Sequence, residues 1–254
     1  MSRPPLVLAS RTAIVTGAGS GIGRALALEA ASQGMAVACC DIGAAGLAET
    51  RAQLLDAGAT VLARALDIGD EGALRMFAAD IGRSLPPTAL LFANAGILRK
   101  ATILDMPLAD WERLFAINVL GTIRTLQAFA PVLAPPAQIV VTGSTGSMAI
   151  HPGLGAYCAT KHALWPICEA LRGEMDEAGR AIGVSMLMPG AVATHIFDQA
   201  APGRAEPVDS ITPPEAARIA FAGALADRPL ILTHPAFVER AEARFAQAVA
   251  DLKS

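Results

Sequence analysis

TAIVTGAGSGIG, at residues 12–23, joins a short run of β-branched and aliphatic residues to a cluster of glycines. The apolar run is typical of a buried strand, and the spacing that follows, from about 21 to 33, predicts a helix. Gly34 comes directly afterwards and is the residue type that most often ends a helix. This stretch therefore predicts a strand that turns through glycines into a helix, which is how a β–α–β unit begins.

The same alternation of short apolar runs and longer helix-period segments continues to the end of the chain. Further strands are predicted at 36–40, 60–65, 88–93, 138–142, 183–188 and 229–233, and helices at 44–56, 70–83, 108–133, 156–178, from 213 onward and at 235–253. The alternation predicts an α/β fold, a Rossmann-type doubly wound parallel sheet of about seven strands flanked by helices on both faces. The length of 254 residues fits a single domain over 1–254, with a mobile substrate lid at about 193–210, where no apolar period is evident.

The composition argues against several classes of protein. A net charge of −3 and a pI of about 5.8 provide no basic field for nucleic acid, and no run approaches the ~18 apolar residues of a membrane span. The cysteines lack metal-binding or redox spacing, which favours a reducing compartment, with the cytoplasm as the default; they are Cys39, Cys40, Cys158 and Cys168. The 53% of hydrophobic residues indicates either a large core or buried subunit interfaces.

The glycine turn is suited to holding a pyrophosphate. Glycines let backbone amides approach the phosphates, which also lie at the positive end of the following helix. The second expected strand ends on Asp41, where a carboxylate can accept hydrogen bonds from the ribose hydroxyls of a dinucleotide. Asp41 could instead cap the next helix. Asp67 lies at the end of the third strand and is followed by Ile68. The two residues could contact the adenine of a dinucleotide, or Asp67 could simply cap the next helix.

Tyr157 is the only tyrosine of the chain, and Lys161 follows it four residues later. This spacing places both side chains on one face of a helix. A phenol has a pKa of about 10, and lowering it by ~2–3 units requires about 3–4 kcal/mol, which two close cations supply in a dry site. The pair therefore indicates an acid–base group, with an ordinary surface Tyr–Lys pair as the alternative.

The glycine turn and the Tyr–Lys pair belong to an ordered set of motifs. The other members are Asn94-Ala95-Gly96, Asn118, Ser144 and Pro189-Gly190. The set resembles the motifs of the classical short-chain dehydrogenase/reductase family, in the family's order. The resemblance implies an NAD(H)-dependent oxidoreductase that interconverts a secondary alcohol and a ketone by hydride transfer. It also implies a homo-oligomer, with a tetramer favoured over a dimer.

Catalytic roles follow from the resemblance. It implies that Tyr157 exchanges a proton with the substrate oxygen, and that Lys161 lowers the Tyr157 pKa and holds the nicotinamide ribose. Ser144 is expected to donate a hydrogen bond to the substrate oxygen. Asn118 is expected to hold a water that links Lys161 to solvent. Two alternatives stay open. Asn118 could be a satisfied buried amide. Ser144 could be only a loop residue, and the neighbouring Thr145 could be mistaken for it.

The resemblance also implies a site for NAD. Its expected members come from the glycine turn and the ends of the later strands: Gly17, Ser20, Gly21, Ile22, Gly23, Asp41, Asp67, Ile68, Asn94, Ala95, Gly96, Tyr157, Lys161, Pro189, Gly190, Val192 and Thr194. Asp41 disfavours a 2′-phosphate, and Ser20 stands where NADP-dependent relatives carry a basic residue. Arg24 lies within the first helix and is expected to point away from the ribose.

The substrate is expected to be a small molecule with a fairly apolar body. This rests on apolar residues in segments that should surround the pocket, namely Leu98, Met148, Leu154, Ile196 and Phe197. His151 and His195 fall in similar segments, with solvated loop histidines as the alternative. The histidines lack ligand spacing, so no metal is expected. Two other classes stay open: an NADPH-dependent carbonyl or oxoacyl reductase, and a non-catalytic dinucleotide-binding regulatory protein.

Overall fold

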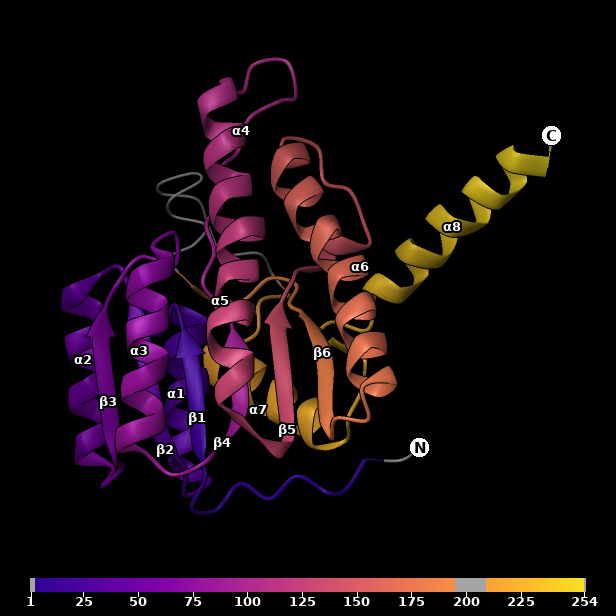
Figure 1. Cartoon of the computed structure of the whole chain (residues 1–254). Coiled ribbons are helices and arrows are strands. Elements are labelled where there is room, and N and C mark those ends of the chain that lie inside the picture. The colour runs from indigo at the N-terminus through magenta and orange to yellow at the C-terminus, as the bar shows by residue number, and fades with distance from the viewer. Residues whose placement is uncertain (1–2, 195–208, 254) are drawn as a thin grey trace.

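The computed structural model describes residues 3–194 and 209–253. Within these residues, seven strands form one parallel sheet in the order β3-β2-β1-β4-β5-β6-β7 (Figure 1). The strands are β1 (Thr12–Thr16), β2 (Ala36–Asp41), β3 (Val61–Ala65), β4 (Thr88–Ala93), β5 (Leu133–Thr142), β6 (Ile182–Met188) and β7 (Leu230–Leu232). The chain starts in the middle of the sheet, winds outward to β3, and returns to build the other half. The predicted doubly wound α/β fold is confirmed.

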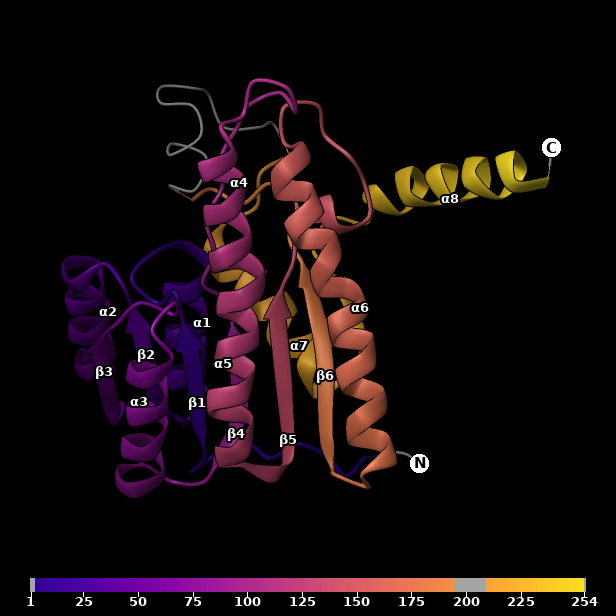
Figure 2. The ribbon, with the colours of Figure 1, turned by 45° about the horizontal axis from the view of Figure 1, so that its top comes forward.

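Helices cover both faces of the sheet (Figures 1 and 2). One face carries α1 (Gly21–Ser32), α2 (Ala44–Asp56) and α7 (Pro213–Leu225), and the other carries α3 (Glu71–Ser84), α5 (Thr122–Phe129) and α6 (Gly155–Glu177). α4 (Leu108–Phe115) continues above α5, and α8 (Phe237–Lys253) ends the chain. Each face has its own hydrophobic cluster, because successive side chains of a strand point to opposite sides. In β1, Val15 joins the cluster of α1 and α7, and Ile14 joins that of α3 and α5.

The helix predicted over 108–133 is divided. α4 passes into a π-helical turn, η1 (Ala116–Gly121), and α5 then ends in a 3₁₀ turn at Ala130–Val132. Apolar spacing does not show such a turn, because one extra residue barely changes the face that is buried. Thr122 Oγ1 donates to the carbonyl of Asn118 within η1 at 2.8 Å. Single π turns often mark functional sites.

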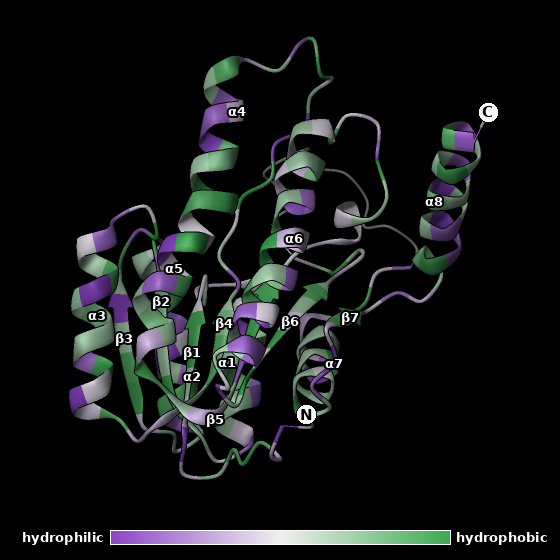
Figure 3. Cartoon of the chain, turned by 45° about the vertical axis from the view of Figure 1, so that its right-hand side comes forward, coloured by the Kyte–Doolittle hydropathy of each residue, from purple (hydrophilic) through white to green (hydrophobic). Residues whose placement is uncertain are grey.

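α8 projects away from the body of the molecule (Figures 1 and 2). Arg244 anchors it by donating to the Met148 carbonyl at 3.0 Å, and Phe245 meets the Trp165 ring edge-on at 6.4 Å. None of its described residues is buried. Figure 3 shows hydrophobic and hydrophilic residues alternating along it. α8 therefore keeps apolar side chains that the other residues of 3–194 and 209–253 do not cover.

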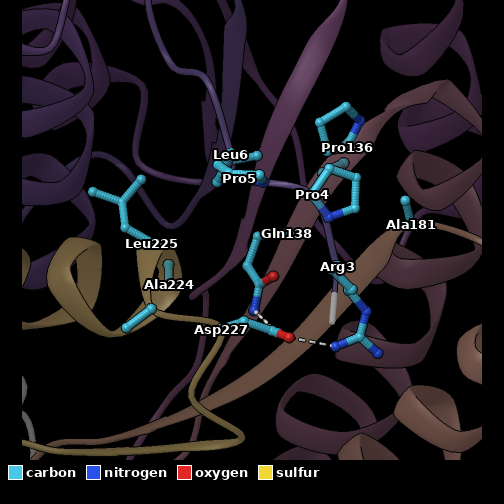
Figure 4. A pocket seen from close by; sticks show the side chains of 12 residues that line it. Arg3, Pro4, Pro5, Leu6, Pro136, Gln138, Ala181, Ala224, Leu225 and Asp227 are labelled. Carbon is cyan, nitrogen blue, oxygen red and sulfur yellow. Dashed lines mark hydrogen bonds and ion pairs between the residues drawn. The ribbon is translucent and has the colours of Figure 1, made fainter. Parts of the chain in front are cut away.

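A cavity of about 410 Å³ lies at the opposite end of the sheet from the glycine turn (Figure 4). It adjoins the amino ends of β5 and β6, where Ala137 pairs with Ile182. Arg3 lines it and forms an ion pair with Asp227 at 2.5 Å, and Arg172 pairs with the same carboxylate at 2.9 Å. These ion pairs tie the N-terminal segment to the end of α7. Because ligands of parallel sheets bind at the carboxyl ends of the strands, this cavity is separate from the candidate site.

Candidate active site

The predicted functional residues gather at the carboxyl edge of the sheet. Asp41 ends β2, Asn94 follows β4, Ser144 lies just beyond β5, and Pro189 follows β6. The glycine turn follows β1 at the same edge. Parallel strands place these segments together although they lie far apart in the chain, and this edge is where doubly wound folds bind their ligands.

Backbone geometry explains the glycines of the turn. Gly17 and Gly21 have φ values of +68° and +52°, which favour glycine. A Cβ on Gly23 would lie 1.9 Å from the Gly17 carbonyl oxygen, so only glycine allows the helix to pack this close to the turn. Ser20 is exposed and is the N-cap of α1, and no side-chain capping bond occupies its hydroxyl. This cradle fits a pyrophosphate.

Asp41 is directed at the glycine turn. Its Oδ2 accepts the N–H of Gly19 at 2.8 Å, and its Oδ1 accepts the N–H of Gly43 at 2.7 Å. Gly43, not Asp41, is the N-cap of α2, so the capping interpretation does not hold. The half-buried carboxylate lies where a ribose next to the pyrophosphate would be expected.

Asp67 and Ile68 lie at the corresponding end of β3. Asp67 is exposed and accepts the N–H of Gly69 at 2.7 Å, whereas Asp70 is the residue that caps α3. Ile68 is buried, and a Cβ on Gly121 of η1 would come within 2.7 Å of its Cδ1. Asp67 is therefore available to a ligand, while Ile68 packs mainly into the protein.

The Arg24 side chain was expected to point away from the cofactor ribose, but in the structure it contacts the glycine turn. Its Nη2 donates to the carbonyl of Gly19 at 2.6 Å and to that of Gly46 at 3.1 Å, and its Nε donates to Thr50 Oγ1 at 2.9 Å. A Cβ on Gly46 would lie 2.6 Å from the Gly19 oxygen. The guanidinium thus joins the glycine turn to α2. The sequence contains no local signal for this contact, since it depends on how two helices pack.

Asn94 connects three strands. Its N–H donates to Thr16 Oγ1 at 3.1 Å, its Nδ2 donates to the Thr16 carbonyl at 3.2 Å, and its Oδ1 accepts the Thr142 hydroxyl at 3.1 Å. Ala95 N–H also reaches Thr16 Oγ1, at 3.2 Å. The predicted support of the central sheet by this motif is thus visible. The two threonines were not among the expected site residues.

Tyr157 and Lys161 lie one turn apart on α6, and both are buried, at 8% and 4% exposure. Lys161 Nζ lies 5.8 Å from the centre of the Tyr157 ring and donates to the Thr142 carbonyl at 2.8 Å. An exposed surface pair is therefore ruled out. The buried ammonium lies where it can act on the phenol and on a bound ribose.

The direction of the Tyr157 pKa differs from expectation. Burial raises it to about 12, although the neighbouring Ser144 side chain acts to lower it. Burial lowers the pKa of Lys161 to about 8. Burial therefore acts against the lowering expected from Lys161 and a bound nicotinamide, because it disfavours the charged phenolate. The phenol is therefore held protonated at neutral pH.

Ser144 begins a short 3₁₀ turn, Thr145–Ser147. Its Oγ accepts the Gly146 N–H at 3.0 Å, and its own N–H donates to Ser147 Oγ at 3.2 Å, which completes a capping box. The Ser144 hydroxyl also interacts with Tyr157. Thr145 is buried at 4% exposure. Ser144 is therefore the hydroxyl that faces the phenol.

Asn118 is fully buried in η1. Its Oδ1 accepts the Ile97 N–H at 2.8 Å, and its Nδ2 donates to the Ile97 carbonyl at 2.9 Å and to Thr160 Oγ1 at 3.1 Å. These contacts match the buried-amide alternative. A Cβ on Gly96 would lie 3.1 Å from Asn118 Oδ1 and 3.4 Å from Lys161 Nζ, so glycine lets the two polar groups approach each other.

The segment after β6 closes the other side of the site. The Pro189 carbonyl accepts the Thr145 N–H at 2.8 Å, which ties it to the serine turn. Val192 pairs with Ile211 in an isolated bridge. A Cβ on Gly21 would lie 3.0 Å from Thr194 Cγ2, so Thr194 meets the glycine turn. Expected cofactor residues from the first strand–helix turn and from the segment after β6 therefore adjoin one another.

The expected substrate residues are only partly described. His195, Ile196, Phe197 and most of the predicted lid lie outside the described residues. Leu98 and Met148 are buried, at 2% and 7% exposure. The His151 ring lies 5.9 Å from that of Phe237, and burial, then Arg240, lowers the His151 pKa. Over residues 3–194 and 209–253, no cluster of three or more His, Cys, Asp and Glu could hold a metal, and no helix could cross a membrane.

Fold and site together define a nicotinamide-type Rossmann oxidoreductase. The family model described as short chain dehydrogenase matches residues 11–205. The chain belongs to the short-chain dehydrogenase family, which confirms the resemblance found in its motifs.

Curated relatives are oxidoreductases. The chain is 32% identical over 229 residues to 1-deoxy-11-beta-hydroxypentalenate dehydrogenase of Streptomyces avermitilis, covering 88% of this chain and 84% of that protein. It is 32% identical over 207 residues to an uncharacterized NAD-dependent oxidoreductase of Mycobacterium tuberculosis, covering 75% and 74%. A match to "Probable oxidoreductase EphD" of the same organism, 33% identical over 185 residues, covers 72% of this chain but only 31% of that longer protein.

Solved structures agree. A short-chain dehydrogenase/reductase from Burkholderia phymatum in complex with NAD superimposes with a TM-score of 0.89, at 29% identity and with 96% of each chain covered. An alcohol dehydrogenase from Thermococcus sibiricus complexed with 5-hydroxy-NADP has a TM-score of 0.78 at 25% identity, with 87% of this chain and 95% of that chain covered. Structurally similar proteins thus include one solved with NAD and one solved with a derivative of NADP.

Proposed function

We propose that this protein interconverts a secondary alcohol and a ketone with NAD(H). The observation that supports it most is the meeting of three groups at the carboxyl edge of the sheet: the Tyr157 phenol, the Ser144 hydroxyl and the buried Lys161 ammonium. A nicotinamide supplies or accepts the hydride when bound. The protein residues bind the substrate oxygen and move its proton, which is the remaining part of the reaction.

In the reductive direction, Ser144 donates a hydrogen bond to the carbonyl oxygen. Tyr157 delivers its proton to that oxygen as the carbon receives the hydride. The raised pKa of the Tyr157 phenol keeps this proton available at neutral pH. Lys161, with its pKa lowered to about 8, can return a proton to the phenolate. Oxidation follows the same path backwards, and Asn118, next to Gly96 and Lys161, lies on the expected route for that proton.

We propose NAD(H) rather than NADP(H) as the cofactor. The Asp41 carboxylate would repel a 2′-phosphate and would accept hydrogen bonds from a ribose diol. Arg24, the nearest basic residue along the first helix, is occupied by the carbonyls of Gly19 and Gly46. Ile42 after Asp41 adds no positive charge, and it is exposed.

We propose an apolar body for the substrate. Leu98 follows β4 and Met148 follows the serine turn, both are buried, and Leu154 precedes α6 directly. The Streptomyces avermitilis relative is named for a hydroxyl-bearing pentalenate. A secondary hydroxyl on a compact hydrophobic framework fits both observations.

We propose that the protein acts as a homo-oligomer in the cytoplasm, built from single domains. α8 exposes Val249 and Leu252, at 48% and 88%, which a second copy could cover. The four cysteines are free and buried, and burial raises the pKa of Cys39 to about 12, which suits a reducing compartment.

The test is an assay of purified protein with NAD⁺ and NADP⁺ against a panel of secondary alcohols, with isothermal titration of NADH alongside. Turnover with NAD⁺ supports the proposal. NADH binding without turnover of any alcohol or ketone would favour the non-catalytic regulatory class. Preference for NADP⁺ would favour the carbonyl or oxoacyl reductase class.

A further inference from the structure

His234 stands at the carboxyl end of β7, directly beside the turn that follows β6. The two strands are parallel neighbours, and Met188 pairs with Leu232 at their ends. The residues that continue each strand, Pro189-Gly190 and Thr233-His234, therefore lie side by side at the catalytic edge. The contact between Gly190 and His234 joins residues 44 positions apart in the chain.

Both ring nitrogens of His234 are engaged. The Gly190 N–H reaches Nδ1 at 3.2 Å and Thr233 Oγ1 at 3.1 Å, and Thr233 Oγ1 lies 2.6 Å from Nδ1. Nε2 lies 3.0 Å from the Asp209 carbonyl oxygen. A carbonyl accepts only, so Nε2 carries the hydrogen, and Nδ1 accepts from the two donors. The ring therefore bridges Gly190 to Asp209.

The ring also sets the position of Gly190 by contact. A Cβ on Gly190 would lie 2.5 Å from Nδ1 and 2.6 Å from Cγ, so the Gly190 backbone packs directly against the imidazole. Phe237 supports the ring edge-on, with centroids 6.4 Å apart. On the far side, the Pro189 carbonyl holds the Thr145 N–H next to Ser144. Movement of the Pro189-Gly190 turn would thus disturb the serine turn.

We propose that His234 is a positioning residue for the nicotinamide end of the cofactor. It holds Gly190 on Nδ1 and couples it through Nε2 to Asp209. The inference rests on the proposed function: the Pro189 carbonyl lies against the turn of Ser144, so the part of the cofactor that this segment contacts would be the nicotinamide, which has to react beside Tyr157. His234 has no contact with Asp41 or the glycine turn among the described hydrogen bonds, so its influence stops short of the adenosine end.

Isothermal titration with NADH and with ADP-ribose tests the proposal, because ADP-ribose lacks the nicotinamide. His234→Ala should weaken NADH binding about 5–20-fold, the effect of one or two lost hydrogen bonds, and leave ADP-ribose binding unchanged. His234→Asn places an amide oxygen near the Nδ1 position and should restore much of the NADH affinity. His234→Gln reaches toward Asp209 instead and should restore less.

His162→Asn is the matched control. His162 is also half-buried and bonded at both ring nitrogens, to the Cys158 carbonyl at 2.8 Å and to Arg244 at 2.6 Å, and its variant should bind NADH normally. Equal losses of NADH and ADP-ribose affinity in His234→Ala, or no loss of either, would overturn the inference. Failure of the unaltered protein to bind both ligands would overturn the proposed function as well, and is recognised by the missing ADP-ribose signal.

Discussion

The Asp41 carboxylate accepts the backbone N–H of Gly19 at 2.8 Å, so the last residue of β2 holds the turn that follows β1. A Cβ on Gly19 would lie 2.8 Å from Asp41 Cγ, which shows how closely the two residues pack. The carboxylate is thereby oriented at the pyrophosphate cradle. Its position, and not only its charge, is the basis for the expected choice of cofactor.

Asp41→Ala should reduce the preference for NAD(H) over NADP(H) by at least about tenfold, because it removes the repulsion of a 2′-phosphate and a ribose acceptor. The measurement is the ratio of kcat/KM for the two cofactors with any working substrate. Asp56→Ala, at the exposed far end of α2, is the control and should leave the ratio unchanged. An unaltered ratio in Asp41→Ala would exclude the role given to Asp41.

Tyr157→Phe should lower kcat by at least ~10²–10⁴-fold, because it removes the group that carries the proton. NADH binding should stay nearly intact, since the ring and the Lys161 contact to the Thr142 carbonyl remain. Steady-state kinetics and NADH titration check the two halves of this prediction. Near-normal kcat would remove Tyr157 from the mechanism.

Ser144→Ala should lose much more activity than Thr145→Ala. Ser144 Oγ faces Tyr157 and caps the Gly146 N–H, whereas Thr145 is buried. The lost cap costs ~1 kcal/mol of stability, so both variants need a melting curve beside the kinetic assay. The reverse order of activities, with both proteins folded, would mean that Thr145 is the hydroxyl that binds the substrate.

The buried Lys161 should make stability depend on pH in a definite direction. Burial lowers its pKa from 10.5 to about 8, so between these values the unfolded chain binds a proton that the folded protein does not. Stability from this group therefore rises as pH increases from about 8 to 10.5, by up to roughly 3 kcal/mol. Urea unfolding of the unaltered protein and of Lys161→Met over that pH range gives the difference between their free energies of unfolding. A difference that stays flat or falls would contradict the lowered pKa.

Substitution of Val249 and Leu252 by Glu should reduce the oligomeric state, if α8 is covered by another copy as proposed. Burying two large apolar side chains contributes about 3–6 kcal/mol, and charges at the same positions oppose it. Light scattering after size exclusion gives the mass. Gln247→Glu adds a charge at a polar position of α8 and should change the mass less. An unchanged mass in the double variant would exclude α8 from the interface.

The strands, the helices and the order of the site motifs were predictable from the sequence. Each depends on spacing over a few residues: a period of two or 3.6, a glycine turn, or an i and i+4 pair such as Tyr157 and Lys161. The helix over 108–133 was wrongly predicted as continuous, because a π turn leaves that spacing nearly intact. Parallel pairing then placed the strand ends together, which also follows from the β–α alternation.

Contacts between distant segments were decided only by the tertiary structure. Arg24 on the carbonyls of Gly19 and Gly46, and His234 on Gly190, have no local signature, because they depend on how neighbouring elements pack. The Tyr157 pKa is a second property that depends on tertiary packing and not on local sequence. Spacing to Lys161 predicted a lowered pKa, but burial raises it to about 12, since desolvation depends on every group that surrounds the phenol. Local sequence thus determined which groups meet, and packing determined their chemical state.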